Sequence, residues 1–182
     1  MRARAVPQPS LDRMVPFAGH PVVVGVVPGG DLLVVRTAAA WADAVGSRVV
    51  AAYADTSRHV VEEHPDGSVT HAPFDPDSAD DSWQKVESRL RAEVDEGLRG
   101  TGVAWELRYL AGRPDRALTH LARAVDAAVI VVGTRAPGSA AHLRELVEGS
   151  VAAHLAHHQH RPVLTVPLAV VDWKELCTPW ER

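Results

Sequence analysis

Short apolar runs of strand length alternate with amphipathic segments of helical length along most of this chain. The first run, HPVVVGVV at residues 20–27, is rich in β-branched residues and is apolar throughout, which is typical of a strand buried on both faces. Helical spacing of apolar residues predicts a helix from Leu33 to Val45 that stops at Gly46, and a second strand is expected at residues 47–54. Parallel strands joined by a helix close by a right-handed crossover almost without exception.

The same alternation returns in the second half of the chain. Helices are expected at residues 83–98, from Pro114, and through the apolar positions Leu143, Val147, Val151 and Leu155, and strands are expected at residues 103–110, 127–133 and 161–167. Alternating strands and helices with apolar strands predict an α/β domain whose parallel sheet is covered on both faces.

Three segments fall outside this alternation. Residues 1–19 hold three prolines and little periodicity, and we expect an extended N-terminal arm before a domain at residues 20–167. Residues 55–80 form a polar insertion, in which a small hairpin around Asp66 and Gly67 is expected. This insertion is interpreted as a surface excursion, with a lid or a partner contact as the alternative. Residues 168–182 form a tail with two tryptophans, which is expected to pack on the body, on a second subunit or on an unknown protein partner.

Composition narrows the function classes. The net charge is -4 and no block of Lys and Arg is present, which argues against a nucleic-acid partner. Apolar runs are too short to span a membrane, and no apolar segment of a secretory signal follows the charged N-terminus. The single cysteine, Cys177, fits a reducing compartment, so a cytoplasmic location is expected.

Three ordered motifs resemble the universal stress protein family, in its single-domain bacterial type. They are VVVGVV at residues 22–27, the stretch from Gly-x-Pro to Val-Val-Gly within residues 110–135, and the Gly-Ser helix with its closing Pro-Val-Leu strand at residues 149–167. The resemblance implies a three-layer α/β/α sandwich with a doubly wound, five-stranded parallel sheet, which is Rossmann-like and similar to adenine nucleotide hydrolases. It also implies a homodimer that pairs through the strand Pro162–Pro167, an edge strand with unpaired backbone groups.

Members of that family that bind ATP resemble the pattern Gly-x2-Gly-x9-Gly-[Ser/Thr], with an Asp at the end of the first strand. Glycines let backbone amides approach phosphates, and a helix N-terminus favours an anion. This chain departs from the pattern in three ways. Val27 stands at the Asp position, and Ala136, followed by Pro137, stands at the position of the second glycine. Neither Ala136 nor Gly138, taken as the second position, gives the expected spacing to Gly149. A residual nucleotide or anion site would comprise Val27, Gly133, Thr134, Arg135, Gly138, Gly149 and Ser150.

The sequence therefore favours a stress-response protein that is not an enzyme, has no cofactor and acts as a homodimer with a degraded nucleotide site. The alternative is an ATP- or AMP-binding switch with at most weak hydrolysis. No nucleophile elbow and no Ser-Gly-Gly-x-Asp-Ser loop of a pyrophosphatase-type ligase is present. His154, His157 and His158 share much of a helix face, but no clear carboxylate or Cys partner sits beside them, so no metal site is predicted.

Overall fold

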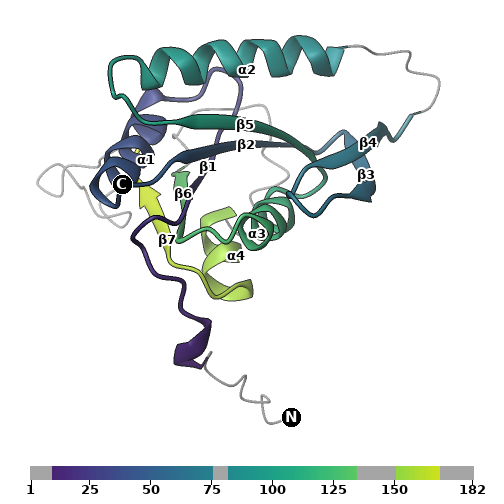
Figure 1. Cartoon of the computed structure of the whole chain (residues 1–182). Helices are drawn as coiled ribbons and strands as arrows, with labels where there is room; N and C mark the ends of the chain where they lie inside the picture. Colours follow the sequence, from purple (N-terminus) through teal and green to yellow (C-terminus); the bar gives the residue numbers. More distant parts are fainter. Residues whose placement is uncertain (1–9, 76–81, 135–150, 169–182) are drawn as a thin grey trace, which may run out of the picture.

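The computed structural model describes residues 10–75, 82–134 and 151–168 of the chain. A parallel sheet of five strands, in the order β5-β2-β1-β6-β7, lies at its centre (Figure 1). In chain order the strands of this sheet are β1 (Val22–Gly25), β2 (Val49–Asp55), β5 (Trp105–Ala111), β6 (Val129–Gly133) and β7 (Val163–Val166). The five strand predictions are confirmed, with observed ends that lie within a few residues of the expected ones.

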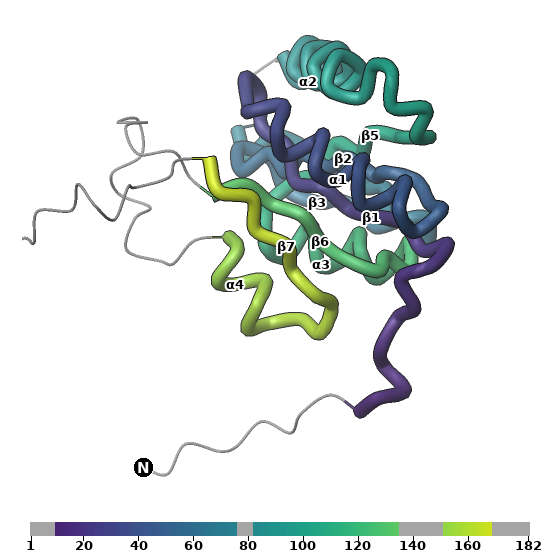
Figure 2. The backbone as a smooth tube through the Cα atoms, turned by 90° about the vertical axis from the view of Figure 1, so that its left-hand side faces the viewer, coloured from purple at the N-terminus to yellow at the C-terminus, as the bar shows by residue number. Residues whose placement is uncertain are grey.

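Helices cover both faces of the sheet. In the described residues the α-helices are α1 (Leu32–Ala44), α2 (Ser82–Leu98), α3 (Pro114–Ala124) and α4 (Val151–His158). Figures 1 and 2 show α1 and α2 on one side and α3 and α4 on the other, so the predicted three-layer α/β/α sandwich is confirmed. The expected helical positions Leu143 and Val147 lie outside the described residues, as do the N-terminal arm up to residue 9 and the tail from residue 169.

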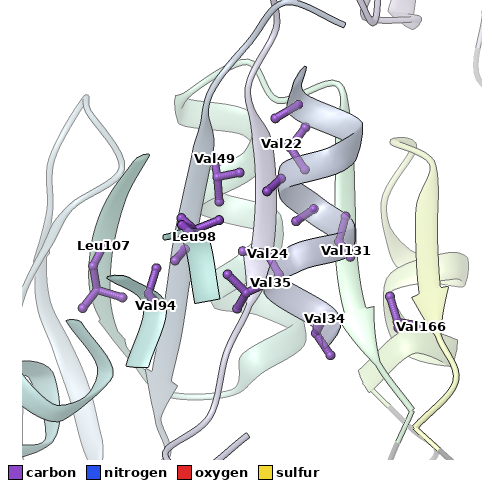
Figure 3. Packing of buried hydrophobic residues seen from close by; sticks show 14 of the residues in the cluster. Val22, Val24, Val34, Val35, Val49, Val94, Leu98, Leu107, Val131 and Val166 are labelled. Atoms are coloured by element: carbon purple, nitrogen blue, oxygen red, sulfur yellow. The ribbon is translucent and has the colours of Figure 1, made fainter. Parts of the chain in front are cut away.

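The valines of β1 explain why this strand is apolar throughout. Val22 and Val24 join the core under α1 and α2, while Val23 joins the separate core under α3 and α4. All three are completely buried, and burying one such side chain contributes about 1.5–3 kcal/mol. Figure 3 shows the first of these cores, in which valines of the sheet meet Val35 of α1 and Leu98 of α2.

Local signals place the ends of the helices. Asp31 caps the N-terminus of α1, because its Oδ1 accepts the backbone N–H of Leu33 at 2.8 Å. The helix ends at Ala44, and Gly46 follows with a φ of 64°, as the sequence predicts for a helix stop. Pro114 is the first residue of α3, where its missing N–H costs no helical hydrogen bond.

The predicted hairpin in the polar insertion is present. Strands β3 (Arg58–Glu63) and β4 (Val69–Pro73) pair antiparallel and form a second sheet of two strands. The turn of the hairpin contacts α3: a Cβ added to Gly67 would lie 2.7 Å from Cδ1 of Leu121 and 3.0 Å from Cβ of Ala124. The hairpin is therefore docked onto the domain through its turn, at a residue that must be small.

Candidate functional site

The strand order reverses between β1 and β6, and the crevice outside their carboxyl ends is where doubly wound sheets bind ligands. Val24 of β1 pairs with Val131 of β6, so the two strands end side by side. Of the predicted site residues, the structure places Val27, Gly133 and Thr134 at this edge. Arg135, Gly138, Gly149 and Ser150 lie outside the described residues.

The polar backbone groups of the loop after β1 form hydrogen bonds within the chain. Val27 is 60% exposed, and its apolar side chain can neither donate nor accept a hydrogen bond. Its carbonyl accepts the N–H of Gly30 at 2.9 Å, across a turn in which Gly29 has a φ of 69°. The N–H of Gly29 donates to the carboxylate of Glu93, a residue of α2, at 3.0 Å. With Asp31 capping α1, amides that could bind an anion are already occupied by the chain's own oxygens.

Glu93 is a charged member of this loop's surroundings that sequence reasoning missed. Partial burial opposes its ionisation, but the hydrogen bonds from Arg89 and from Gly29, and the charge of Arg89, outweigh burial and lower its pKa. The Arg89 Nε lies 2.7 Å from the Glu93 carboxylate. The carboxylate is therefore ionised at neutral pH, is neutralised by Arg89, and occupies the amide of Gly29 as its hydrogen-bond acceptor.

The end of β6 is closed in a similar way. The N–H of Thr134 donates to the carbonyl of Val166 at 2.8 Å, and its Oγ1 accepts the N–H of Leu168 at 2.8 Å. A Cβ added to Gly133 would lie 3.0 Å from both Cδ1 of Leu168 and Cγ2 of Val34. Gly133 thus serves close packing against the segment that follows β7. Nothing in the sequence pattern pointed to Leu168, because the interaction depends on the sheet bringing β6 and β7 together.

A second polar cluster lies where β2 and β5 end. Asp55 accepts hydrogen bonds from the Tyr109 hydroxyl at 2.6 Å and from the Ser57 hydroxyl at 2.6 Å. Burial raises the pKa of Asp55, but these hydrogen bonds and the charge of Arg58 outweigh burial, so the pKa is lowered overall. Burial and the hydrogen bond to Asp55 raise the pKa of Tyr109, so its hydroxyl stays protonated as the donor.

The same cluster anchors the hairpin. Arg58 is 8% exposed, its Nε donates to Nδ1 of His71 at 2.8 Å, and its guanidinium lies over the ring of Trp83 at 5.8 Å. Burial and the neighbouring charge of Arg58 lower the pKa of His71, in keeping with an unprotonated Nδ1 that accepts the hydrogen bond from Arg58. These groups hold β3, β4 and α2 together, and their bonds are all internal. We therefore assign the cluster a structural role.

The histidines of α4 have a carboxylate neighbour that sequence reasoning missed. Nδ1 of His154 lies 3.5 Å from Oδ2 of Asp115, which is contributed by α3. The interpretation that these histidines lack a clear carboxylate partner is therefore wrong, because the partner comes from another helix. Among residues 10–75, 82–134 and 151–168, however, no group of three His, Cys, Asp or Glu side chains is arranged to hold a metal ion.

The architecture is a Rossmann-like α/β/α sandwich, and comparisons with known proteins identify its family. The model of the universal stress protein family matches residues 20–167, so the chain belongs to the universal stress protein family. A search of curated proteins gave no match. In the part of the chain that the structure describes, no helix is both long and apolar enough to cross a membrane.

Solved structures agree with this assignment. A universal stress protein from Archaeoglobus fulgidus is 22% identical, with a TM-score of 0.58 over 82% of this chain and 94% of that one. A universal stress protein in complex with cAMP is 25% identical, with a TM-score of 0.57 over 82% of this chain and 98% of that one. The Archaeoglobus fulgidus protein in complex with dAMP is 20% identical, with a TM-score of 0.57 over 81% of this chain and 97% of that one.

Proposed function

We propose that this universal stress protein acts in the cytoplasm as a homodimer that is not an enzyme and works through protein contacts. In this proposal the crevice between β1 and β6 no longer binds nucleotide. The observation that carries it is that polar groups on both sides of the crevice are occupied by the chain itself: Gly29 by Glu93, and Thr134 by Val166 and Leu168.

Val27 adds to this argument. The pattern of the ATP-binding members has an Asp carboxylate at the end of the first strand. Valine at this position offers neither a charge nor a hydrogen bond. Losing a hydrogen bond that involves a charged group costs about 1.5–3 kcal/mol, which is about a tenfold to hundredfold loss of affinity. Glu93 also accepts the N–H of Gly29, so this amide is not free to bind a phosphate.

The backbone of β7 supports the homodimer. The carbonyls of Pro162 and Val166 accept hydrogen bonds from β6, and alternation along the strand turns the N–H and C=O of Thr165 toward the open edge. Of the strands that the structure describes, β7 pairs with β6 alone. An antiparallel match with the same strand of a second copy would satisfy these groups in a two-fold interface.

Nucleotide binding is tested by calorimetry with ATP and with AMP. We expect no binding at the crevice. Val27→Trp places a bulky ring at the end of β1, and any nucleotide affinity that is measured should therefore be the same in this variant as in the wild type. Leu11→Trp is the matched control, because Leu11 is 91% exposed and lies in the N-terminal segment. Sub-millimolar ATP binding that Val27→Trp abolishes and Leu11→Trp preserves would overturn the proposal.

The homodimer is tested by light scattering during gel filtration. Thr165→Pro removes one outward-facing N–H without breaking the ladder to β6, and we expect it to yield a monomer. Thr165→Val retains the N–H and should remain dimeric. A wild-type monomer, or a dimer that Thr165→Pro leaves intact, contradicts pairing through β7.

A nucleotide-dependent switch is the second candidate function. It is favoured by Gly133 and Thr134 at the end of β6 and by the cAMP complex of a relative that is 25% identical. In that case AMP or cAMP would bind the wild-type chain, and Val27→Trp would weaken the binding. The calorimetry above therefore separates the two candidates.

A further inference from the structure

Two adjoining cavities lie away from the crevice, on the side of the sheet that α3 and α4 cover. The larger, of about 690 Å³, is a groove between α3 and α4. The smaller, of about 280 Å³, lies between the hairpin, the end of β5 and the start of α3. Arg113, Arg116 and His120 line both cavities, so the two are neighbours. Their combined size is within the range of small-molecule sites.

The groove is cationic although the chain as a whole is acidic. Its lining consists of Arg113, Asp115, Arg116, Thr119, His120, Arg123, His154 and His158. Among the described residues, three arginines and three histidines thus line the groove beside one carboxylate, in a chain whose net charge is -4. A local excess of this kind raises the concentration of anions at the groove.

Asp115, the one carboxylate that the described residues contribute to the groove, is already hydrogen-bonded. Both oxygens of Asp115 accept hydrogen bonds from Arg113, at 3.2 and 3.1 Å, and one oxygen lies 3.5 Å from His154. Burial opposes ionisation of Asp115, but the hydrogen bonds and the charge of Arg113 outweigh burial and lower its pKa. Asp115 therefore orders Arg113 and His154 at one end of the groove and, among the described residues, forms no ion pair with Arg116 or Arg123.

Two arginines have no such partner. Within residues 10–75, 82–134 and 151–168, neither Arg116 nor Arg123 forms an ion pair, and both are exposed. They lie two turns apart on one face of α3, about 10 Å along the helix axis. His120 lies between them and His158 faces them from α4. Within the described part of the chain, the guanidinium groups of Arg116 and Arg123 are therefore donors without a carboxylate acceptor, and phosphate oxygens can accept several hydrogen bonds from them at once.

The smaller cavity has a different chemistry. Its apolar lining consists of Val60, Val69, Phe74, Leu110, Ala111 and Ala117. Phe74 is 65% exposed, and its ring lies 5.2 Å from the ring of His59, both from the hairpin. His120 joins the two cavities: its Nδ1 lies 3.4 Å from Glu63, while its Nε2 is buried without a hydrogen-bond partner in the described part of the chain.

We infer that the two cavities form one binding site for a small phosphate ester that carries an apolar or aromatic ring. The phosphate binds Arg116, Arg123 and the imidazoles of the groove, and the ring enters the hairpin cavity beside Phe74. A carboxylate ligand would satisfy fewer of these donors, because it has two oxygens and one charge. The site is separate from the crevice between β1 and β6 and does not depend on the function proposed for the crevice.

The test uses 1-naphthyl phosphate and inorganic phosphate as probes, with binding followed by calorimetry on the full chain at low ionic strength. We expect naphthyl phosphate to bind at least about tenfold more tightly than inorganic phosphate, because only the ester reaches the apolar cavity. Arg116→Gln with Arg123→Gln should weaken both probes by about tenfold or more. Phe74→Ala should weaken naphthyl phosphate and leave inorganic phosphate unchanged.

Two control variants test whether the probes bind at the two cavities and not elsewhere on the protein. Arg99→Gln removes an exposed arginine from the end of α2 and should change neither affinity, whereas a general charge effect would weaken both. Val27→Trp blocks the crevice and should also change neither affinity. Loss of binding in Val27→Trp would assign the probe to the crevice and overturn the inference. An absence of binding by naphthyl phosphate would also overturn it, as would binding of naphthyl phosphate that neither the double arginine variant nor Phe74→Ala weakens.

A phosphate ester can also be a lipid headgroup. Sedimentation with phosphatidylcholine vesicles, with and without phosphatidic acid, separates these sources. We expect the soluble ester to bind and the vesicles to leave the protein in solution. Binding to phosphatidic acid vesicles without binding of naphthyl phosphate would contradict a small-molecule site.

Discussion

Replacing Gly67 by alanine tests how firmly the hairpin is docked onto α3. Gly67 has a φ of 80°, and a left-handed backbone costs a residue with a Cβ about 1–2 kcal/mol. The new Cβ would also lie 2.7 Å from Cδ1 of Leu121, whose side chain is completely buried, and 3.0 Å from Cβ of Ala124. Such overpacking costs about 1–3 kcal/mol, so we expect Gly67→Ala to lower the free energy of unfolding by about 2–5 kcal/mol.

Gly46→Ala is the matched control. Gly46 also has a positive φ, of 64°, but an added Cβ would meet nothing within 4 Å. The control therefore carries the backbone cost without the clash, and the difference between the two variants isolates the contact with α3. Urea unfolding followed by circular dichroism measures both. Equal destabilisation by Gly67→Ala and Gly46→Ala would refute a close contact between the hairpin turn and α3.

Three further predictions concern polar groups described above. The pKa of His71 is lowered by burial and by Arg58, so its contribution to stability is fully present above about pH 6.5 and is lost as the pH falls toward its folded-state pKa. His71→Gln should therefore reduce the fall in Tm between about pH 7 and pH 5, whereas the exposed His157→Gln should not. Tyr109→Phe removes a donor to Asp55 and should cost about 1–3 kcal/mol in urea unfolding; a change below about 0.5 kcal/mol would contradict the role of that bond. Asp31→Ala removes the N-cap of α1 and should cost about 1 kcal/mol, with Asp31→Asn as the variant that retains the cap.

The fold could be predicted from the sequence because its signals are local and repeated. A strand buried on both faces must be apolar at every position, as Val22, Val23 and Val24 are. The helices that alternate with such strands in the sequence are recognised because their apolar residues recur at helical spacing instead. Gly46 and Pro114 marked helix ends because their backbone chemistry is tied to those positions. Local signals of this kind need no knowledge of which segments meet.

The candidate site could be predicted only in part. Val27 and Gly133 were found because a motif names their positions. Glu93 and Leu168 were not, since an acidic residue on an amphipathic helix and a leucine after a strand have ordinary explanations in sequence. Their roles depend on contacts between distant segments: Gly29 with Glu93, and Thr134 with Leu168. Sequence spacing cannot specify such contacts.

The order of strands in the sheet has a consequence for synthesis of the chain. Strands β1, β2 and β5 can pair once residue 111 has been made, but the other edge of β1 stays open until β6 is complete at Gly133. During that interval the nascent chain presents an unpaired edge of valines, which is a template for other strands. A ribosome that stalls between β5 and β6 would therefore leave a partly folded sheet that is prone to aggregation.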